Sequence, residues 1–183
     1  MVAEIARRDE KVWASIAKDI GAHVGFMQAI RKTPLEPTLR ELVIGQANLI
    51  TSLPLEAAKK VEEWILAAQE KGERPEALVD KIMTIGNVTR ARATLIARTE
   101  TARAATMLTE VRAKSIKSEG YIWTSAHDRN VRPLHRKLDG TFHRWDDPPI
   151  SDERTGIRSL PGAIWGCRCI AKVQIPEAMW TTQ

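Results

Sequence analysis

The stretch that most constrains the fold is residues 87–124, NVTRARATLIARTETARAATMLTEVRAKSIKSEGYIWT. It contains no proline, no glycine before Gly120, and many residues that favour helix. Asn87 and Thr89 are both suitable N-caps. We expect one helix of roughly eight turns, about 45 Å long, followed by a strand over 121–124, where β-branched and aromatic side chains dominate.

On the N-terminal side, apolar residues recur at helical spacing and predict a series of shorter helices. The expected ranges are 5–20, 24–31, 38–49, 55–71 and 75–83. Lys71-Gly72 is a standard helix stop, because glycine readily adopts the left-handed conformation. Amphipathic helices suit protein docking, so residues 1–84 are expected to form a helical docking region.

On the C-terminal side the sequence pattern predicts strands and loops instead of helices. Asp139-Gly140 predicts a tight hairpin turn, a long loop is expected over 145–162, and a final strand over 164–175. Trp123, Trp145 and Trp165 are expected to form the core of this module. The predicted fold class is α+β, with helices over 1–84, a long basic helix over 85–120 and a β-rich module over 121–183.

Composition excludes several classes of protein. The 183 residues include 28 Lys and Arg against 23 Asp and Glu, for a net charge of +5. No apolar run approaches the roughly 18 residues of a membrane span, the start is charged rather than signal-like, and two cysteines cannot make a disulfide framework. We expect a protein without a membrane partner.

The densest group of reactive side chains is TSAHDRNVRPLHRKLDG, residues 124–140, together with Cys167-Arg168-Cys169 further on. One interpretation is a metal site. Two thiolates and an imidazole are zinc donors. In a strand, two residues separated by one other residue point to the same side. Both sulfurs could meet His135 or Asp128 across the sheet. His135, Cys167 and Cys169 are the candidate ligands of a structural zinc, against the alternative that the cysteines are ordinary small buried residues.

A second interpretation is acid–base or nuclease-like catalysis. His127 or His135 would be the base, Arg132 an anion clamp and Asp128 the orienting carboxylate. Because His127 and Asp128 are adjacent, they would face opposite sides of a strand, which disfavours a joint role. Non-enzymatic function is therefore the prediction.

The third and favoured interpretation is structural. A module of about 60 residues has a marginal core, so buried hydrogen bonds or a bound metal would help to hold it. The polar residues would then tie loops to strands.

The long helix is rich in basic side chains. Residues 84–120 include seven basic and three acidic residues. One interpretation is sequence-independent contact with DNA phosphates. The alternative is a solvated helix or pairing with a protein. The candidate contacts are Arg90, Arg92, Arg103, Arg112, Lys114 and Lys117.

Taken in order, these motifs resemble the phage Mu F-like domain, also called the head-morphogenesis domain, of tailed-phage minor head proteins. The resemblance spans about residues 87–176. It rests on the ordered series W-x₄-D-x₃-R-P-x-H-x₂-L-D-G, then P-P, then C-R-C. Its motif positions here are Arg98, Glu100, Trp123, Asp128, Arg132, His135, Asp139, Gly140, Cys167 and Cys169.

The resemblance implies a minor structural protein of a tailed-phage or prophage head. It implies association with the portal or other head proteins, and a role in head assembly or DNA packaging and delivery. The expected location is the virion, and the host cytoplasm during assembly. The alternatives are a non-specific DNA-binding accessory protein and a nuclease- or transferase-like enzyme delivered with the genome.

Overall fold

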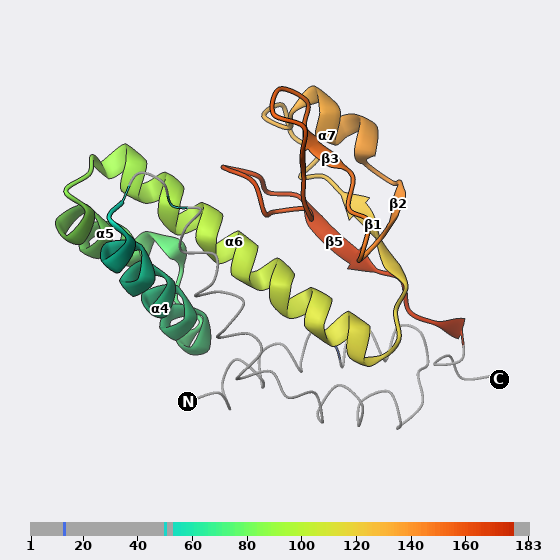
Figure 1. The fold of residues 1–183 in the computed structure, drawn as a ribbon, viewed down its shortest axis with the longest axis horizontal. Helices are drawn as coiled ribbons and strands as arrows, with labels where there is room; N and C mark the ends of the chain where they lie inside the picture. Colours follow the sequence, from blue (N-terminus) through green and yellow to red (C-terminus); the bar gives the residue numbers. More distant parts are fainter. Residues whose placement is uncertain (1–12, 14–49, 51–52, 178–183) are drawn as a thin grey trace.

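The computed structural model describes Trp13, Ile50 and residues 53–177. Within these residues helices come first and a few antiparallel strands follow, so the α+β prediction is confirmed (Figure 1). The helices expected over 5–20, 24–31 and 38–49 lie outside the described residues, apart from Trp13, which is helical.

The helical part consists of α4 (Leu55–Lys71), the 3₁₀ helix η2 (Pro75–Leu78), α5 (Val79–Gly86) and α6 (Arg90–Ser115). Helix α4 ends as expected at Gly72, whose φ of 68° is left-handed. The segment expected as one helix over 75–83 begins with Pro75 in a 3₁₀ turn before α5. Asn87 ends α5 rather than starting α6.

Helix α6 is the central element, and α4 and α5 pack against it (Figure 1). It begins at the N-cap Thr89, whose hydroxyl accepts a hydrogen bond from the Arg92 amide. At 26 residues it is shorter than the expected range, because the chain leaves the helix at Ile116. Val61, Ile82 and Ile96 are fully buried where the helices meet.

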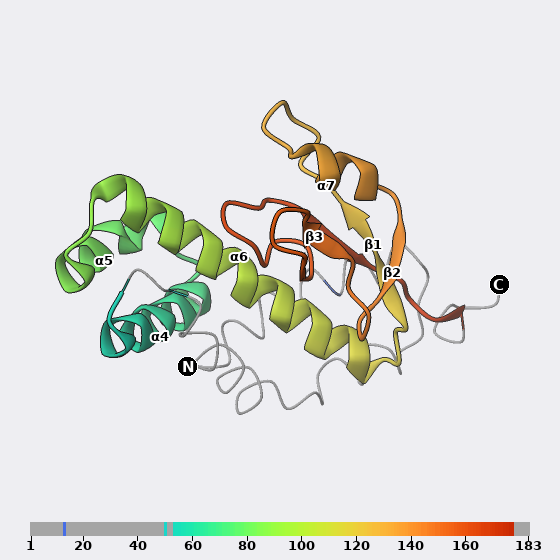
Figure 2. The same cartoon turned by 45° about the horizontal axis from the view of Figure 1, so that its top comes forward.

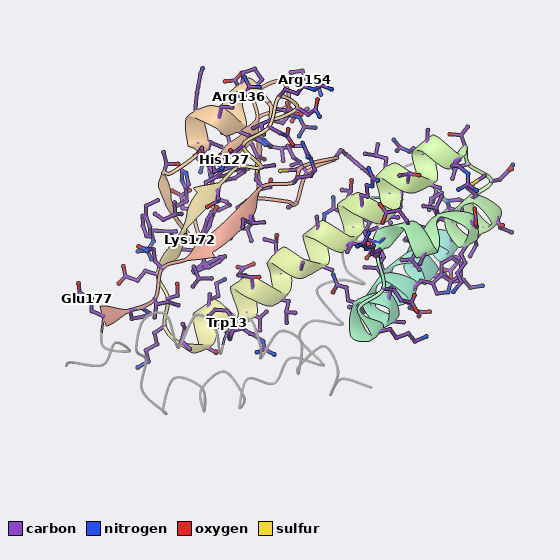
Figure 3. All side chains as sticks on the ribbon, turned by 180° about the vertical axis from the view of Figure 1, so that it is seen from behind. Trp13, His127, Arg136, Arg154, Lys172 and Glu177 are labelled. Carbon is purple, nitrogen blue, oxygen red and sulfur yellow. The ribbon has the colours of Figure 1, made fainter. Side chains whose placement is uncertain are left out.

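The C-terminal module is built on a three-stranded antiparallel sheet in the order β2-β1-β5. Strand β1 (Gly120–Thr124) lies between β2 (Phe142–Arg144) and β5 (Ile170–Val173). Tyr121 and Trp123 point to one face and are both fully buried. This inner face packs toward the C-terminal end of α6, near Trp13 (Figure 3).

The prediction of a hairpin around Asp139-Gly140 is wrong. Residues Pro133–Leu138 instead form a short helix, α7. Pro133 occupies its first turn, where a missing N–H costs nothing. The positive-φ Gly140 (77°) then turns the chain from α7 into β2, while Asp139 keeps a negative φ of −57°.

The long loop expected over 145–162 also contains structure. Strands β3 (Ile150–Asp152) and β4 (Ile157–Arg158) form a separate two-stranded sheet that lies beside α7. Of the three predicted core tryptophans, Trp123 and Trp145 are buried in the module. Trp165 instead is half-buried and packs on the helical core, under the guanidinium of Arg92.

A buried ionic group lies where α4 meets α6. It comprises Glu62 of α4, with Glu100 and Arg103 of α6, whose side chains pair one turn apart. Burial, with the charge of Glu100, raises the pKa of Glu62 to about 8. Burial likewise raises the pKa of Glu100, although Arg103 opposes it. Glu100 therefore pairs with Arg103 and lies beside Glu62, and this group joins α4 to α6.

The loop over 161–166 joins the two parts of the fold, because it lies along α6 (Figure 2). Arg103 donates from Nε and Nη2 to the Ala163 carbonyl at 3.1 and 2.9 Å. Thr106 donates to the Pro161 carbonyl at 2.8 Å. The Gly166 amide donates to the Thr99 hydroxyl at 3.1 Å. One face of α6 thus fixes the loop that leads into the two cysteines.

Among the helices that the structure describes, none is both long enough and apolar enough to cross a lipid bilayer.

Candidate functional site

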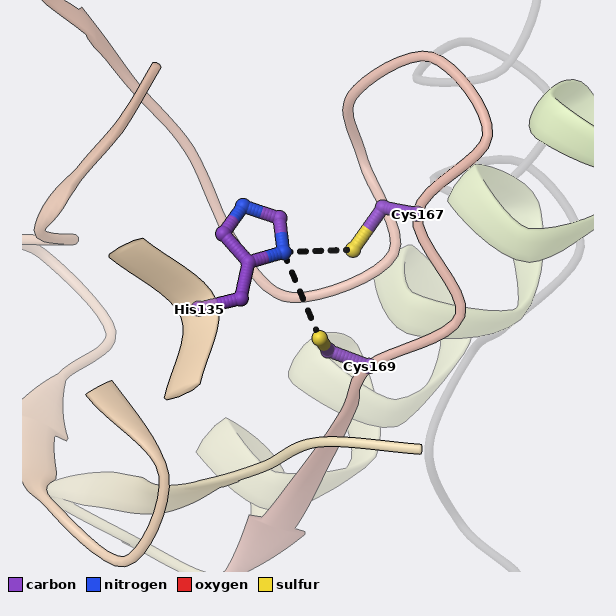
Figure 4. A group of neighbouring side chains, drawn as sticks. All are labelled: His135, Cys167 and Cys169. Atoms are coloured by element: carbon purple, nitrogen blue, oxygen red, sulfur yellow. Dashed lines mark hydrogen bonds between the residues drawn. The ribbon is translucent and has the colours of Figure 1, made fainter. Parts of the chain in front are cut away.

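His135, Cys167 and Cys169 meet in the interior of the C-terminal module. The His135 Nδ1 lies 3.6 Å from the Cys167 Sγ and 3.5 Å from the Cys169 Sγ. The imidazole projects from α7, while both thiols come from the segment just before β5 (Figure 4). All three side chains are buried, at 2%, 5% and 4% exposure. Arg168, between the cysteines, points outward.

The orientation of His135 is fixed on its other side. Its Nε2 lies 3.0 Å from the carbonyl oxygen of Ser151 in β3. A carbonyl can only accept, so Nε2 carries the proton and Nδ1 presents its lone pair to the two sulfurs. The Trp123 ring packs edge-on against the imidazole, with centroids 5.2 Å apart. The ring is thus held in one tautomer and one direction.

The cysteine segment is fixed by backbone geometry. The Gly162 amide donates to the Cys167 sulfur at 3.4 Å. Gly162 has a φ of +83°, and a Cβ there would lie 3.0 Å from the Thr106 hydroxyl and 3.2 Å from the Cys169 carbonyl oxygen. Glycine is therefore required where the loop passes between α6 and the cysteines.

The protonation of the cluster is shared among its members. The contact with Cys169, together with the contact with His135 and the hydrogen bond from the Gly162 amide, lowers the pKa of Cys167 to about 4 against the effect of burial. The same contact raises the pKa of Cys169. The hydrogen bond with Cys167 raises the pKa of His135.

This trio is the one group in the described part of the chain whose His, Cys, Asp or Glu atoms converge as a metal site would require. All candidate ligand atoms lie within 4.8 Å of one another. Donor type and spacing in the sequence predict the same three residues.

The arrangement expected for acid–base catalysis does not form. Asp128 accepts from Arg168 at 2.8 Å, and this bond lowers the pKa of its carboxyl group. His127 lies on the surface and pairs with Asp139 at 2.8 Å (Figure 3). Asp128 therefore orients neither histidine, and the packing interpretation accounts for these side chains.

The other motif positions also hold the fold together. Asp139 accepts from the Ser125 amide at 2.7 Å, which fixes the end of β1. Arg132, predicted as an anion clamp, donates instead to the Trp165 carbonyl at 2.6 Å. Arg98 pairs on the surface with Glu76 at 2.9 Å.

The predicted phosphate contacts on α6 are wrong for two residues. Arg103 and Arg112 are buried, at 6% and 2% exposure, so they do not face a phosphate backbone. Both lie on the sides of α6 that pack against the rest of the fold. Arg90 and Lys114 are exposed but pair with Asp80 and Glu110, at 2.6 Å each.

Four residues with structural roles were not predicted from the sequence. Glu62 belongs to the buried ionic group, Thr99 and Thr106 bind the 161–166 loop, and Ser151 orients His135. A signal existed for the two threonines, since positions 99, 103 and 106 share one face of a helix. No local signal marks Ser151, because its carbonyl reaches His135 only when β3 packs beside α7 in the folded chain.

Comparison with known proteins agrees with the motif series and extends it. Residues 59–172, well over half of the chain, match the family described as Phage Mu protein F like protein. The match starts earlier than residue 87, within α4, so it includes the helices that carry the buried ionic group.

A relative aligns over a longer part of the chain than the family match does. The chain is 26% identical over 175 residues to a protein of Haemophilus influenzae (strain ATCC 51907 / DSM 11121 / KW20 / Rd) that is described as uncharacterized. The alignment includes 94% of this chain and 37% of the relative, so the chain spans little more than a third of that protein's length. No solved structure matches the chain. The matched helices, sheet and Cys-Arg-Cys segment show that this chain belongs to the Phage Mu protein F like family, a structural family related to phage heads.

Proposed function

We propose that this chain is a minor head protein of a tailed phage or prophage, that it binds the portal protein, and that it acts in head assembly or DNA packaging and delivery. Membership of a phage head-related family supports the general setting. The portal is the partner that the family resemblance implies, and the exposed surface of the fold suggests where it would bind.

The observation that supports the proposal is that large apolar side chains are exposed on the outer face of the three-stranded sheet. Ile122 pairs with Phe142, and Thr124 pairs with Ile170, so these side chains share one face. Phe142 is 49% exposed and Ile170 is 61% exposed. Large apolar side chains gathered on an exposed face are typical of protein-binding surfaces.

A protein partner fits this surface better than DNA does. Binding to a phosphate backbone requires accessible cations. On α6, however, Arg103 and Arg112 are buried, and Lys114 is paired with Glu110. We therefore place the contact on the exposed sheet face that carries Phe142 and Ile170, on which Lys172 lies opposite Ile122. A docking role for residues 1–84 stays a prediction.

The experiment is co-purification with the portal protein encoded in the same phage genome. The full chain is expected to retain the portal on an affinity column. The double variant Phe142→Ser, Ile170→Ser should weaken retention more than tenfold, since central apolar contacts dominate interface energy. Ile157→Ser is the matched control, because Ile157 is also 49% exposed but lies on β4, outside this sheet.

Two results would count against the proposal, in different ways. Failure of the unmodified chain to retain the portal would reject the partner. Equal retention by the double variant and the Ile157→Ser control would reject the sheet face as the contact.

A further inference from the structure

We propose that His135, Cys167 and Cys169 bind a zinc ion that fastens α7 to the segment before β5. The inference is independent of the portal interaction. It rests on four features of the cluster: its distances, the tautomer of its histidine, its charge and its surroundings.

The distances fit a tetrahedral ion. With Zn–S bonds of about 2.3 Å and Zn–N bonds of about 2.0–2.1 Å, a tetrahedral angle separates nitrogen from sulfur by about 3.6 Å. The Nδ1 of His135 lies 3.6 and 3.5 Å from the two sulfurs. All three ligand atoms lie within 4.8 Å of one another, so small side-chain adjustments would let one zinc ion reach them.

The histidine is already prepared as a ligand. Zinc-binding imidazoles usually donate their second N–H to a carbonyl or carboxylate, which fixes the ring. Here the Nε2 of His135 donates to the Ser151 carbonyl at 3.0 Å. Ser151 is itself 1% exposed, and its hydroxyl bonds Ser159 at 2.6 Å. The free lone pair of Nδ1 is aimed at the two sulfurs (Figure 4).

The charge of the complex suits a buried position. Two thiolates balance the charge of Zn²⁺, and the imidazole binds as the neutral form, so the group carries no net charge. The Gly162 amide donates to the Cys167 sulfur, an additional contact that stabilises a thiolate. Burying a neutral complex avoids the large cost of burying an isolated ion.

The donor set selects the class of metal. Two sulfurs and one imidazole favour zinc over magnesium or calcium, which prefer oxygen ligands. Three protein ligands leave one tetrahedral position for a water molecule or another donor. The surrounding module is small, with a core built largely on Trp123, Tyr121 and Trp145, so a metal staple would strengthen it substantially.

The test measures zinc in the full-length protein, purified under reducing conditions without chelator. About one zinc per chain is expected by elemental analysis. After removal of the metal, added Co²⁺ should produce the thiolate charge-transfer and intense visible bands of a tetrahedral sulfur site. Cys169→Ser and His135→Ala should each weaken Co²⁺ binding by more than about 100-fold.

The matched control is His127→Ala, which removes an exposed histidine that pairs with Asp139 outside the cluster. It should bind zinc and Co²⁺ like the unmodified chain. Chelator should lower the melting temperature of the unmodified chain and of this control, but not that of the ligand variants.

The cobalt spectrum of the unmodified chain decides the question even if a ligand variant fails to fold. A folded, reduced chain that contains no zinc and gives no tetrahedral cobalt bands would overturn the proposal. So would a cobalt spectrum that His127→Ala abolishes and Cys169→Ser leaves unchanged.

Discussion

Replacing Arg103 with alanine should lower the free energy of unfolding by about 3–5 kcal/mol, the usual cost of removing one partner from a buried ion pair. Arg103 is 6% exposed and is the cation beside two buried carboxyl groups. The same side chain makes two hydrogen bonds to the Ala163 carbonyl. The substitution would therefore leave Glu100 uncompensated and release the loop that precedes the cysteines.

Chemical denaturation of the full chain measures this effect, and α6 supplies its own control. Arg98→Ala removes an arginine five residues earlier, whose pair with Glu76 is exposed at 62% and 52%. Exposed pairs of this kind contribute about 1 kcal/mol or less. Arg103→Lys should give an intermediate loss, because it keeps the charge without the planar fork. Equal effects of Arg103→Ala and Arg98→Ala would show that the buried pair does not stabilise the fold.

Glu62→Gln should make the protein more stable at alkaline pH and change little near pH 5. The pKa of Glu62 is raised to about 8 in the folded chain, chiefly by burial, from its ordinary value of 4.5. The folded state therefore holds a proton that the unfolded state has lost between these two values. By linkage, stability falls as pH rises across this window and is constant above it.

The glutamine variant has no such proton to lose. Above pH 8 we expect it to exceed the unmodified chain by at least about 2 kcal/mol. Melting temperatures measured from pH 5 to pH 9 test this. Glu56→Gln is the control on the same helix, since Glu56 is 82% exposed. Parallel pH profiles for the unmodified chain and Glu62→Gln would contradict the assignment.

The elements set by local chemistry were predictable from sequence. Helix α6 follows from its composition and the Thr89 cap, and the end of α4 follows from Gly72. Helix α7 carried a local signal as well, since Pro133 suits a first helical turn. Asp139-Gly140 favours a hairpin turn between two strands by its local sequence, whereas in the structure this turn joins the helix α7 to the strand β2.

Features that depend on tertiary packing were not predictable in the same way. Glu62 and Glu100 lie 38 positions apart, and nothing local reveals that both would be buried beside one arginine. Arg103 shows the consequence, because a basic residue on a helix suggested phosphate contact until its burial was known. The convergence of His135 with the two cysteines was predictable by donor type, whereas its anchor at Ser151 depends on the fold.

The most direct test of the proposed function is the protein content of purified particles. Phage or induced prophage particles should be separated into heads and tails, and peptides of this chain should be quantified by mass spectrometry against the portal protein. The account predicts that the chain accompanies the portal in the head fraction at a constant ratio and is missing from tails. Heads that contain portal but lack this chain, while the chain stays in the soluble lysate, would contradict it.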